Sequence, residues 1–329
     1  MIVVVTGASA GVGRATAREF AAHGWHVALL ARNVTRLASA ADEIRRYGVK
    51  ALAIVADVAD AAAVEAAAAR VENELGRIDA WINNAMATVF SPAISVTPQE
   101  FRRGTEVTYL GQVYGTLAAL KRMRSRDRGT IVNVGSALSY RAIPLQSVYC
   151  GAKYAVRGFT DALRSELIHD RSAIKLVMVH LPAVNTPQFE WALNKTGLRP
   201  QPMPPIYQAE VAARAIYFAA TRLKHREIWV GQSAIKAIIA NKLAPSLLDH
   251  YLATSGYTGQ LTEEAVSYDA PANLFETVDG DFGAHGRFDR QARNVSLELT
   301  LRRHAGTAVA AVLGAVALAL VGRYLGRRL

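Results

Sequence analysis

The stretch of sequence that decides the fold is Thr6-Gly7-Ala8-Ser9-Ala10-Gly11-Val12-Gly13. It follows a run of β-branched residues at Ile2–Thr6 and opens a helical pattern at Val12–His23. Glycine is needed in such a turn because the chain bends tightly and its backbone approaches a pyrophosphate at the helix N-terminus. A glycine triplet alone is weak evidence, but its place at the first strand-to-helix turn makes it specific for a dinucleotide.

From this turn onward the chain alternates β-branched runs with longer helical patterns, as in a parallel sheet covered by helices on both faces. Helices are predicted at Thr35–Tyr47 and Ala61–Leu75, and another begins with a capping box formed by Thr97 and Glu100 around Pro98. The further predicted strands are His26–Ala31, Lys50–Ala56, Ile78–Asn83, Thr130–Val134, Lys175–Leu181 and Glu227–Gly231. The sequence therefore predicts an α/β fold with a doubly wound, Rossmann-like parallel sheet of about seven strands.

Three regions are predicted along the chain: a nucleotide-binding catalytic domain at 1–252, an irregular extension at 253–300 and a tail at 301–329. The helical pattern Ile235–Leu252 closes the first region, and we expect it to pack against the sheet domain. The Pro-rich segment Pro187–Tyr207 follows a strand end and predicts a substrate lid, with a plain surface excursion as the alternative. Asp279-Gly280-Asp281 lacks the ligand series of a calcium loop and predicts a turn.

The tail contains eighteen uncharged residues, Ala305–Gly322, with arginines on both sides. As a helix this segment would be about 27 Å long, close to the thickness of a bilayer's hydrocarbon core. We therefore predict a C-terminal transmembrane anchor, with a buried terminal helix of the sheet domain as the alternative. Charge leaves the orientation open, and the catalytic domain is expected to face the cytoplasm. No cleaved signal peptide is expected at the N-terminus.

The composition argues against several classes of protein. Of the 329 residues 51% are apolar, which supports a packed core rather than a disordered chain. The net charge of +11 lies partly in clusters without interleaved aromatic residues, so no nucleic-acid binding is expected. The single cysteine, Cys150, excludes an intramolecular disulfide, and we interpret it as a packed thiol rather than a nucleophile. The scattered histidines, His180 among them, lack metal-ligand spacing, so no metal site is predicted and they receive no role.

The second predicted strand ends at Ala31-Arg32, where this fold places the residue that selects the cofactor. An acid at this place binds the ribose 2′-hydroxyl of NAD, whereas an arginine accepts the 2′-phosphate of NADP. Arg32 offers a guanidinium and no carboxylate is available, so NADP(H) is predicted and NAD(H) is the less favoured cofactor. The alternative is that Arg32 is a surface residue at the start of the next helix.

Tyr149 and Lys153 lie four residues apart on a predicted helix, so their side chains share one face. A free phenol has a pKa near 10 and is a poor acid or base at neutral pH. A nearby ammonium stabilises the phenolate, so we expect Lys153 to lower the pKa of Tyr149. Ser136 follows the fifth predicted strand and can donate a hydrogen bond to a substrate oxygen.

Together these motifs resemble the short-chain dehydrogenase/reductase family over residues 1–231, in the order and spacing of that family. The resemblance implies hydride transfer with Tyr149 as general acid/base, Lys153 at the nicotinamide ribose and Ser136 orienting the substrate. It also implies homodimers or homotetramers. The implied cofactor-binding residues are Gly7, Ser9, Gly11, Val12, Gly13, Arg32, Asp57 at the adenine, Asn83 supporting the central strand, Ala85, Tyr149, Lys153, and Val184 and Thr186 at the nicotinamide carboxamide.

Three residues depart from the family pattern: Met86 replaces a glycine after Asn83-Asn84-Ala85, Thr108 replaces a relay asparagine, and Leu181-Pro182 lacks the usual following glycine. These changes bear on efficiency and substrate range. The predicted function is an oxidoreductase that transfers hydride between NADP(H) and a small alcohol or carbonyl substrate, lipophilic to judge from the lid and the tail. The alternative is a non-enzymatic, NADP(H)-binding membrane sensor or scaffold with the same fold.

Overall fold

The computed structural model describes residues 1–222 and 225–302. Its centre is a seven-stranded sheet in the order β12-β7-β6-β4-β1-β2-β3, and every neighbouring pair of strands is parallel. The strands are β1 Ile2–Thr6, β2 His26–Ala31, β3 Ala51–Val55, β4 Ala80–Asn83, β6 Thr130–Ser136, β7 Lys175–Leu181 and β12 Glu227–Trp229. The doubly wound sheet is thus confirmed, with strand ends shifted by one or two residues from the prediction.

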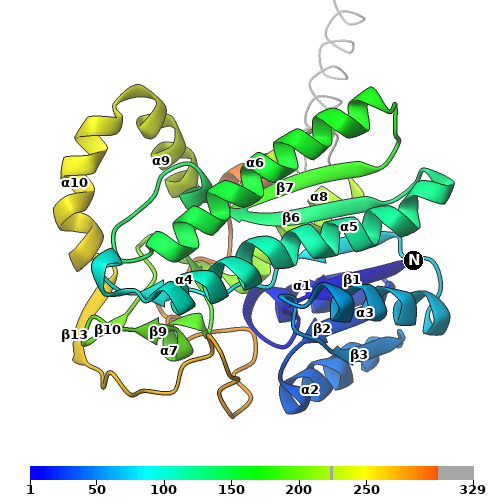
Figure 1. Cartoon of the computed structure of the whole chain (residues 1–329), viewed down its shortest axis with the longest axis horizontal. Helices are drawn as coiled ribbons and strands as arrows, with labels where there is room; N and C mark the ends of the chain where they lie inside the picture. Colours follow the sequence, from blue (N-terminus) through cyan, green and yellow to red (C-terminus); the bar gives the residue numbers. More distant parts are fainter. Residues whose placement is uncertain (223–224, 303–329) are drawn as a thin grey trace, which may run out of the picture.

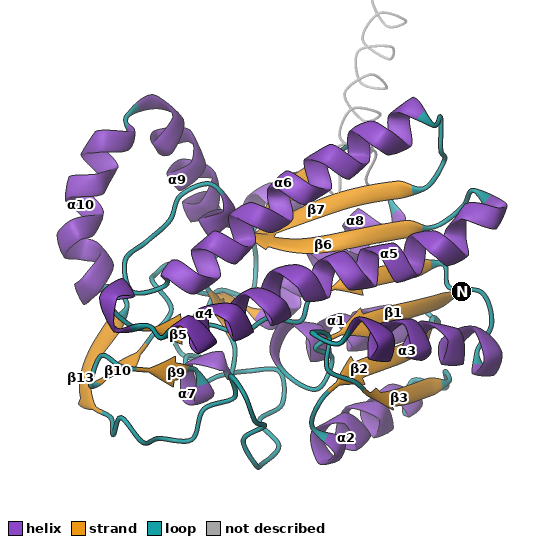
Figure 2. Ribbon diagram, viewed as in Figure 1, coloured by secondary structure: helices purple, strands orange, loops and turns teal. Residues whose placement is uncertain are grey.

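Helices cover both faces of the sheet (Figure 2). Helices α1 (Gly11–Ala22), α2 (Val34–Arg45) and α8 (Ala209–Thr221) bury one core against the sheet. Helices α3 (Ala61–Glu74), α5 (Gly111–Met123) and α6 (Ser147–His169) bury a second core on the opposite face. Helix α4 (Pro98–Thr105) begins with the predicted capping box, in which Thr97 and Glu100 satisfy each other's backbone amides.

The strand order reverses at β1, which lies between β2 and β4. Because all seven strands are parallel, their carboxyl ends meet at one edge, and the reversal opens a crevice there. The glycine turn after β1 and Ser136 at the end of β6 therefore lie at the same edge.

Short elements surround this edge: β5 Val89–Phe90, β8 Val184–Asn185, α7 Gln188–Trp191, β9 Leu193–Asn194, β10 Leu198–Pro200 and β11 Tyr207–Gln208. Several of them lie in the predicted lid, so the segment is more ordered than its proline content suggests. Pairing of β9 with β5 and of β11 with β8 joins the lid to the segments that follow β4 and β7.

The single helix predicted at Ile235–Leu252 is wrong, because two helices occupy this region: α9 (Gln232–Leu243) and α10 (Pro245–Thr258). Proline cannot donate a backbone hydrogen bond and disfavours helical geometry in the residue before it, so the chain turns at Ala244. The expected packing is found only in part. Ile238 and Leu252 are buried, but Leu243 is 80% exposed at the turn between the helices.

The extension predicted as irregular is also partly regular, since α10 continues to Thr258 and β13 (Leu261–Ala265) pairs antiparallel with β10. After β13 the chain returns across the carboxyl edge of the sheet as the segment Asn273–Asp289, here called the strap (orange in Figure 1). Leu274, Ala284 and Phe288 of the strap are buried in three separate hydrophobic clusters. The extension is therefore packed onto the sheet domain.

Most of the predicted membrane anchor, 303–329, lies outside the described residues. Among the residues that the structure does describe, no helix has both the length and the apolar character that a membrane crossing requires.

Candidate active site

A cavity of about 610 Å³ lies at the carboxyl edge of the sheet. All of the predicted site residues line it except Gly13 and Asn83: Gly7, Ser9, Gly11, Val12, Arg32, Asp57, Ala85, Ser136, Tyr149, Lys153, Val184 and Thr186. The sequence motifs, which are spread over most of the sheet domain, thus converge on one site.

The glycine turn fits a dinucleotide. Gly7 and Gly11 have φ angles of +67° and +56°, in the left-handed region that favours glycine. A Cβ atom on Gly13 would lie 2.1 Å from the carbonyl oxygen of Gly7, so a side chain there would destroy the turn. Gly13 therefore shapes the turn from beneath, while Gly7 and Gly11 face the cavity.

Asn83 also acts from beneath the cavity. Its side-chain oxygen accepts a hydrogen bond from Trp81 Nε1 at 2.8 Å, and its Nδ2 donates to Asn133 Oδ1 at 2.8 Å and to Thr116 Oγ1 at 2.9 Å. These bonds join β4 to β6 and α5 at full burial. Asn83 thus supports the central strands, as expected, but its side chain is occupied by protein partners and does not face the cavity.

Ser136, Tyr149 and Lys153 lie together on one wall of the cavity. Lys153 is 1% exposed and donates a 2.6 Å hydrogen bond to the carbonyl of Val134, which fixes its ammonium 5.5 Å from the centre of the Tyr149 ring. Burial lowers the pKa of Lys153 to about 7. Burial raises the pKa of the Tyr149 phenol, and the neighbouring Ser136 hydroxyl offsets this only in part.

The expected lowering of the Tyr149 pKa by Lys153 is therefore wrong for this structure. Desolvation dominates at the half-buried phenol, and desolvation also weakens the positive charge on Lys153. At neutral pH Tyr149 holds its proton, which makes it a proton donor to a substrate oxygen.

His180, to which the sequence assigned no role, lies directly behind Ser136. It is fully buried, with Nδ1 at 3.2 Å from the Ser136 carbonyl oxygen and Nε2 at 3.3 Å from Glu227 Oε2. Burial alone would raise the pKa of Glu227, but hydrogen bonds from His180 and Tyr140 lower it to about 2. Both ring nitrogens of His180 face oxygen atoms, one on the Ser136 backbone and one on the Glu227 side chain. The pair therefore fixes the end of β6 that presents Ser136.

Thr108 is not available for a proton relay. Its hydroxyl donates to the carbonyl of Ala87 at 2.9 Å and accepts from the Ala87 amide at 2.9 Å, at full burial. Thr108 thereby holds the loop after β4, in a π-helical turn at Glu106–Leu110. Met86 in that loop lines the cavity, as its position in the sequence suggested.

The basic residues after β2 differ in what they offer a ligand. Arg32 donates through Nη1 to the carbonyl of Phe275 at 2.8 Å and through Nη2 to that of Asn273, both in the strap. Asp57, expected at the adenine, forms an ion pair with Arg103. The predicted phosphate-binding arginine thus has both terminal nitrogens engaged by the protein.

Arg36, one turn into α2, is the residue that the sequence analysis missed. It is 4% exposed, lines the cavity, and is stacked 4.7 Å from the Trp191 ring and 5.6 Å from the Phe282 ring. Its Nε and Nη1 have no hydrogen-bond partner within the described residues. Burial lowers the pKa of Arg36, and the carboxylates of Asp281 and Asp279 offset this only in part. No sequence pattern pointed to Arg36, because Phe282, which contacts its guanidinium, lies far along the chain.

The opposite end of the cavity is largely apolar. Its walls come from the predicted lid and from the helix pair α9–α10, through Pro202, Met203, Pro204, Ala237, Ala240, Leu248 and Leu252. The lid segment is thus a wall of the site rather than a surface excursion. Cys150 faces away from this chemistry: it is buried, and burial raises the pKa of its thiol to about 11.

The sequence profile of the short chain dehydrogenase family matches residues 1–196. The chain belongs to this family. It is 34% identical over 286 residues to the uncharacterized oxidoreductase YxnA of Bacillus subtilis (strain 168), a match that covers 84% of this chain and 80% of the relative. It is 32% identical over 192 residues to a 3-dehydrosphinganine reductase of Danio rerio, covering 57% of each.

Among solved structures, the fold is similar to an alcohol dehydrogenase from the archaeon Thermococcus sibiricus complexed with 5-hydroxy-NADP. The TM-score is 0.60 at 26% identity, and the match covers 70% of this chain and 95% of that chain. Family membership makes this short-chain dehydrogenase an oxidoreductase that acts on alcohol or carbonyl groups.

Proposed function

We propose that this short-chain dehydrogenase reduces a lipophilic carbonyl compound with NADPH. The observation that supports the proposal most directly is the placement of the Tyr149 phenol beside Ser136 and Lys153 on the cavity wall. A protonated phenol can deliver a proton to a carbonyl oxygen, which suits the site to the reductive direction.

NADP(H) is the proposed cofactor because the adenosine end of the site is strongly basic. Arg36, whose buried Nε and Nη1 have no hydrogen-bond partner among the described residues, and Arg32 both line the cavity. A phosphomonoester would give these N–H groups an acceptor and add to the compensation that Asp279 and Asp281 provide, whereas the hydroxyl of NAD would add none. The Thermococcus sibiricus relative, solved with 5-hydroxy-NADP, is consistent with this choice.

In the proposed mechanism, a bound reduced nicotinamide supplies the hydride to the carbonyl carbon. Tyr149 donates its proton to the carbonyl oxygen, so that an alcohol forms and a phenolate remains. The Ser136 hydroxyl orients the oxygen beside the phenol. Lys153, fixed by the Val134 carbonyl, takes up positive charge more readily once the phenolate forms, because an adjacent anion favours its protonated form.

The proposal of a lipophilic substrate rests on the apolar wall made by the lid and the α9–α10 pair. Apolar pockets with a few polar groups hold ligands by burying their surface while the polar groups fix orientation. Gln146 and Gln260, hydrogen-bonded to each other at 2.7 Å, supply polar groups on this wall. A purely non-enzymatic sensor is not favoured, because Ser136, Tyr149 and Lys153 are assembled.

The C-terminal anchor at 301–329, with the catalytic domain facing the cytoplasm, is also proposed. Its support is the uncharged segment Ala305–Gly322 between arginines. Deletion of 301–329 should move the protein from the membrane to the soluble fraction of a cell lysate. If the shortened protein still sediments with membranes, the anchor lies elsewhere.

The proposed reaction is tested with Tyr149→Phe, assayed for NADPH oxidation against a panel of aliphatic and aromatic carbonyl compounds. We expect turnover to fall at least about 100-fold while NADPH binding is retained, since general acid catalysis commonly contributes that much. Tyr154→Phe is the control, because Tyr154 lies on the same helix but donates to the Tyr140 carbonyl outside the cavity. Equal turnover in the Tyr149 variant and the wild type would refute the assignment.

A further inference from the structure

The strap follows the same path across the sheet edge as the proposed cofactor. It begins at the end of β2, crosses the glycine turn after β1 and ends at the loop after β7. Those three places hold the adenosine, pyrophosphate and nicotinamide parts of a dinucleotide in this fold. The strap therefore lies along the whole length of the proposed cofactor site.

At the adenosine end, the strap contacts the residues that follow β2. The carbonyls of Asn273 and Phe275 accept hydrogen bonds from Arg32, and Thr277 Oγ1 accepts from Asn33 Nδ2 at 3.3 Å. The side chains of Asn273 and Thr277 line the cavity itself. Part of the strap is therefore a wall of the site.

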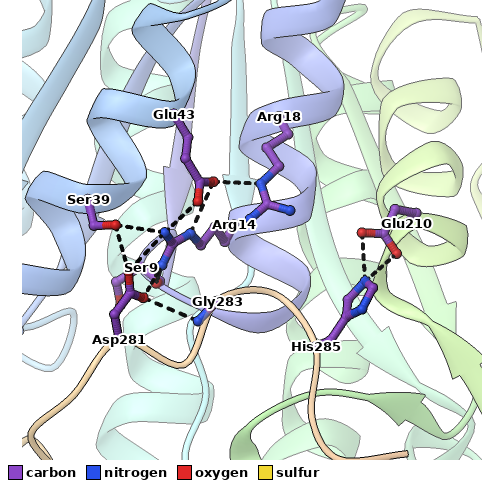
Figure 3. Close-up of polar contacts among 9 residues, drawn as sticks. All are labelled: Ser9, Arg14, Arg18, Ser39, Glu43, Glu210, Asp281, Gly283 and His285. Carbon is purple, nitrogen blue, oxygen red and sulfur yellow. Dashed lines mark hydrogen bonds and ion pairs between the residues drawn. The ribbon is translucent and has the colours of Figure 1, made fainter. Parts of the chain in front are cut away.

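At the glycine turn, the strap is held by Arg14 of α1 (Figure 3). Arg14 is 2% exposed and forms an ion pair with Asp281, which also accepts a 2.6 Å hydrogen bond from Ser39. Glu43, at 2.6 Å from Arg14, provides the second carboxylate. The hydrogen bond from Arg14 is the main reason that the pKa of Asp281 is lowered to about 2, so this contact is fully ionised at neutral pH.

Beside this ion pair, the backbones of the strap and the turn touch. The Gly11 amide donates to the Gly283 carbonyl at 3.1 Å. Further along, a Cβ atom on Gly286 would lie 2.5 Å from the carbonyl oxygen of Thr186, so a glycine is needed for the strap to lie this close. Asn185 Nδ2 then donates a 2.9 Å hydrogen bond to Asp289 Oδ1, at the nicotinamide end of the proposed cofactor site.

The two ends of the strap are fixed differently from its middle. Leu274 at 1% and Phe288 at 4% exposure are buried in hydrophobic clusters, whereas Asp279 and Asp281 are exposed. Side chains buried among apolar neighbours resist local opening, while an exposed polar segment opens at low cost. The segment between these ends, 275–283, is thus the part of the strap that can lift.

We propose that the strap is the outer wall of the cofactor site and that release of the cofactor requires segment 275–283 to lift, with the Arg14–Asp281 ion pair as its latch. The proposal rests on the proposed function, because it takes a nicotinamide dinucleotide as the occupant. Asp281 is a positioning residue: it acts through Arg14 and holds Asn273 and Thr277 over the adenosine end. Weakening the latch accelerates cofactor release without altering the chemistry at Tyr149.

The test measures the rate at which NADPH leaves the full-length protein, by stopped-flow displacement with excess NADP. Asp281→Asn keeps the shape of the side chain and removes its charge. We expect release to accelerate about 10-fold, which corresponds to a latch weakened by about 1.4 kcal/mol. The matched control is Asp279→Asn, which removes an equal charge two residues earlier, and none of the Arg14 bonds involves Asp279.

A second variant distinguishes weakening of the latch from a loss of folding. Gly286→Ala pushes the strap away from the Thr186 carbonyl and should also accelerate release, with an unchanged melting temperature of the sheet domain as the check on folding. If Asp281→Asn and Asp279→Asn release NADPH at the same rate, the latch is refuted while the proposed function stands. If the wild-type protein binds neither NADPH nor NADH, the proposed function and the latch both fail.

Discussion

Replacing Arg36 by glutamine should abolish the preference for NADPH over NADH. Arg36 lines the cavity, and two of its N–H groups, Nε and Nη1, have no partner within the described residues. A hydrogen bond to a charged group contributes about 1.5–3 kcal/mol. Two such bonds to a 2′-phosphate give about 3 kcal/mol or more, and a loss of about 3 kcal/mol weakens binding roughly 100-fold.

The effect on the unliganded protein should be small, because two changes oppose each other. The substitution removes stacking on Trp191 and Phe282, worth about 2 kcal/mol when the cation is desolvated. It also removes a buried guanidinium whose desolvation Asp279 and Asp281 offset only in part, which costs stability in the wild type. We therefore expect a melting temperature close to that of the wild type, which separates this prediction from a general loss of structure.

The assay is equilibrium titration of NADPH and of NADH, followed by quenching of tryptophan fluorescence. NADPH affinity should fall about 100-fold, and NADH affinity should change less than about threefold. Comparison of the affinities for 2′,5′-ADP and 5′-AMP measures the contribution of the 2′-phosphate without that of the nicotinamide. Arg45→Gln is the matched control, since Arg45 lies in the last turn of the same helix, half exposed and paired with Asp42. Equal losses for both cofactors, or an unchanged NADPH affinity, would refute the assignment of Arg36.

Three further predictions concern the charged groups of Lys153 and Glu227. Lys153 has a folded-state pKa of about 7, below its ordinary 10.5, so the unfolded chain binds an extra proton between these values. The free energy of unfolding should therefore rise as pH increases from 7 to 10.5. Chemical denaturation should show that rise in the wild type and a flatter profile in Lys153→Met, and identical profiles would contradict the burial of Lys153. Glu227→Gln leaves the buried His180 ring without its carboxylate and loosens Ser136, so kcat should fall about 10-fold while NADPH affinity stays unchanged, and a normal kcat would exclude Glu227 as a positioning residue. Glu227 has its folded-state pKa at about 2, below the ordinary 4.5, so its contribution to stability is present above pH 4.5 and is lost as pH falls toward 2. The free energies of unfolding of the wild type and Glu227→Gln should therefore differ above this pH range and converge below it.

Local patterns were sufficient to predict the sheet and the centre of the site. The glycine turn and the Tyr149–Lys153 spacing depend on residues close together in the sequence, and the structure places both at the cavity. The break between α9 and α10 was also visible in the sequence, since Pro245 disfavours a continuous helix; helical spacing alone was the wrong guide there.

The residues that were missed or misassigned depend on contacts between distant parts of the chain. Arg32 and Arg36 differ in their contacts because the strap, more than 200 residues later, engages the first, while Nε and Nη1 of the second have no partner among the described residues. His180 gains a role only because β12 places Glu227 beside it. The raised Tyr149 pKa likewise follows from burial, which spacing on a helix does not reveal.

The strap also has a mechanical consequence. Its contacts with the sheet edge lie one after another along the chain. Once the bonds of Arg293, Asn294 and Glu298 have opened, tension applied at Arg302 loads these contacts singly, from Asp289 toward Asn273. The central strands, each bonded to neighbours along their full length, bear such a load across many bonds at once. A pull on the C-terminal end would therefore open the nucleotide groove while the sheet remains intact. Binding and release of the cofactor would then depend on the applied force.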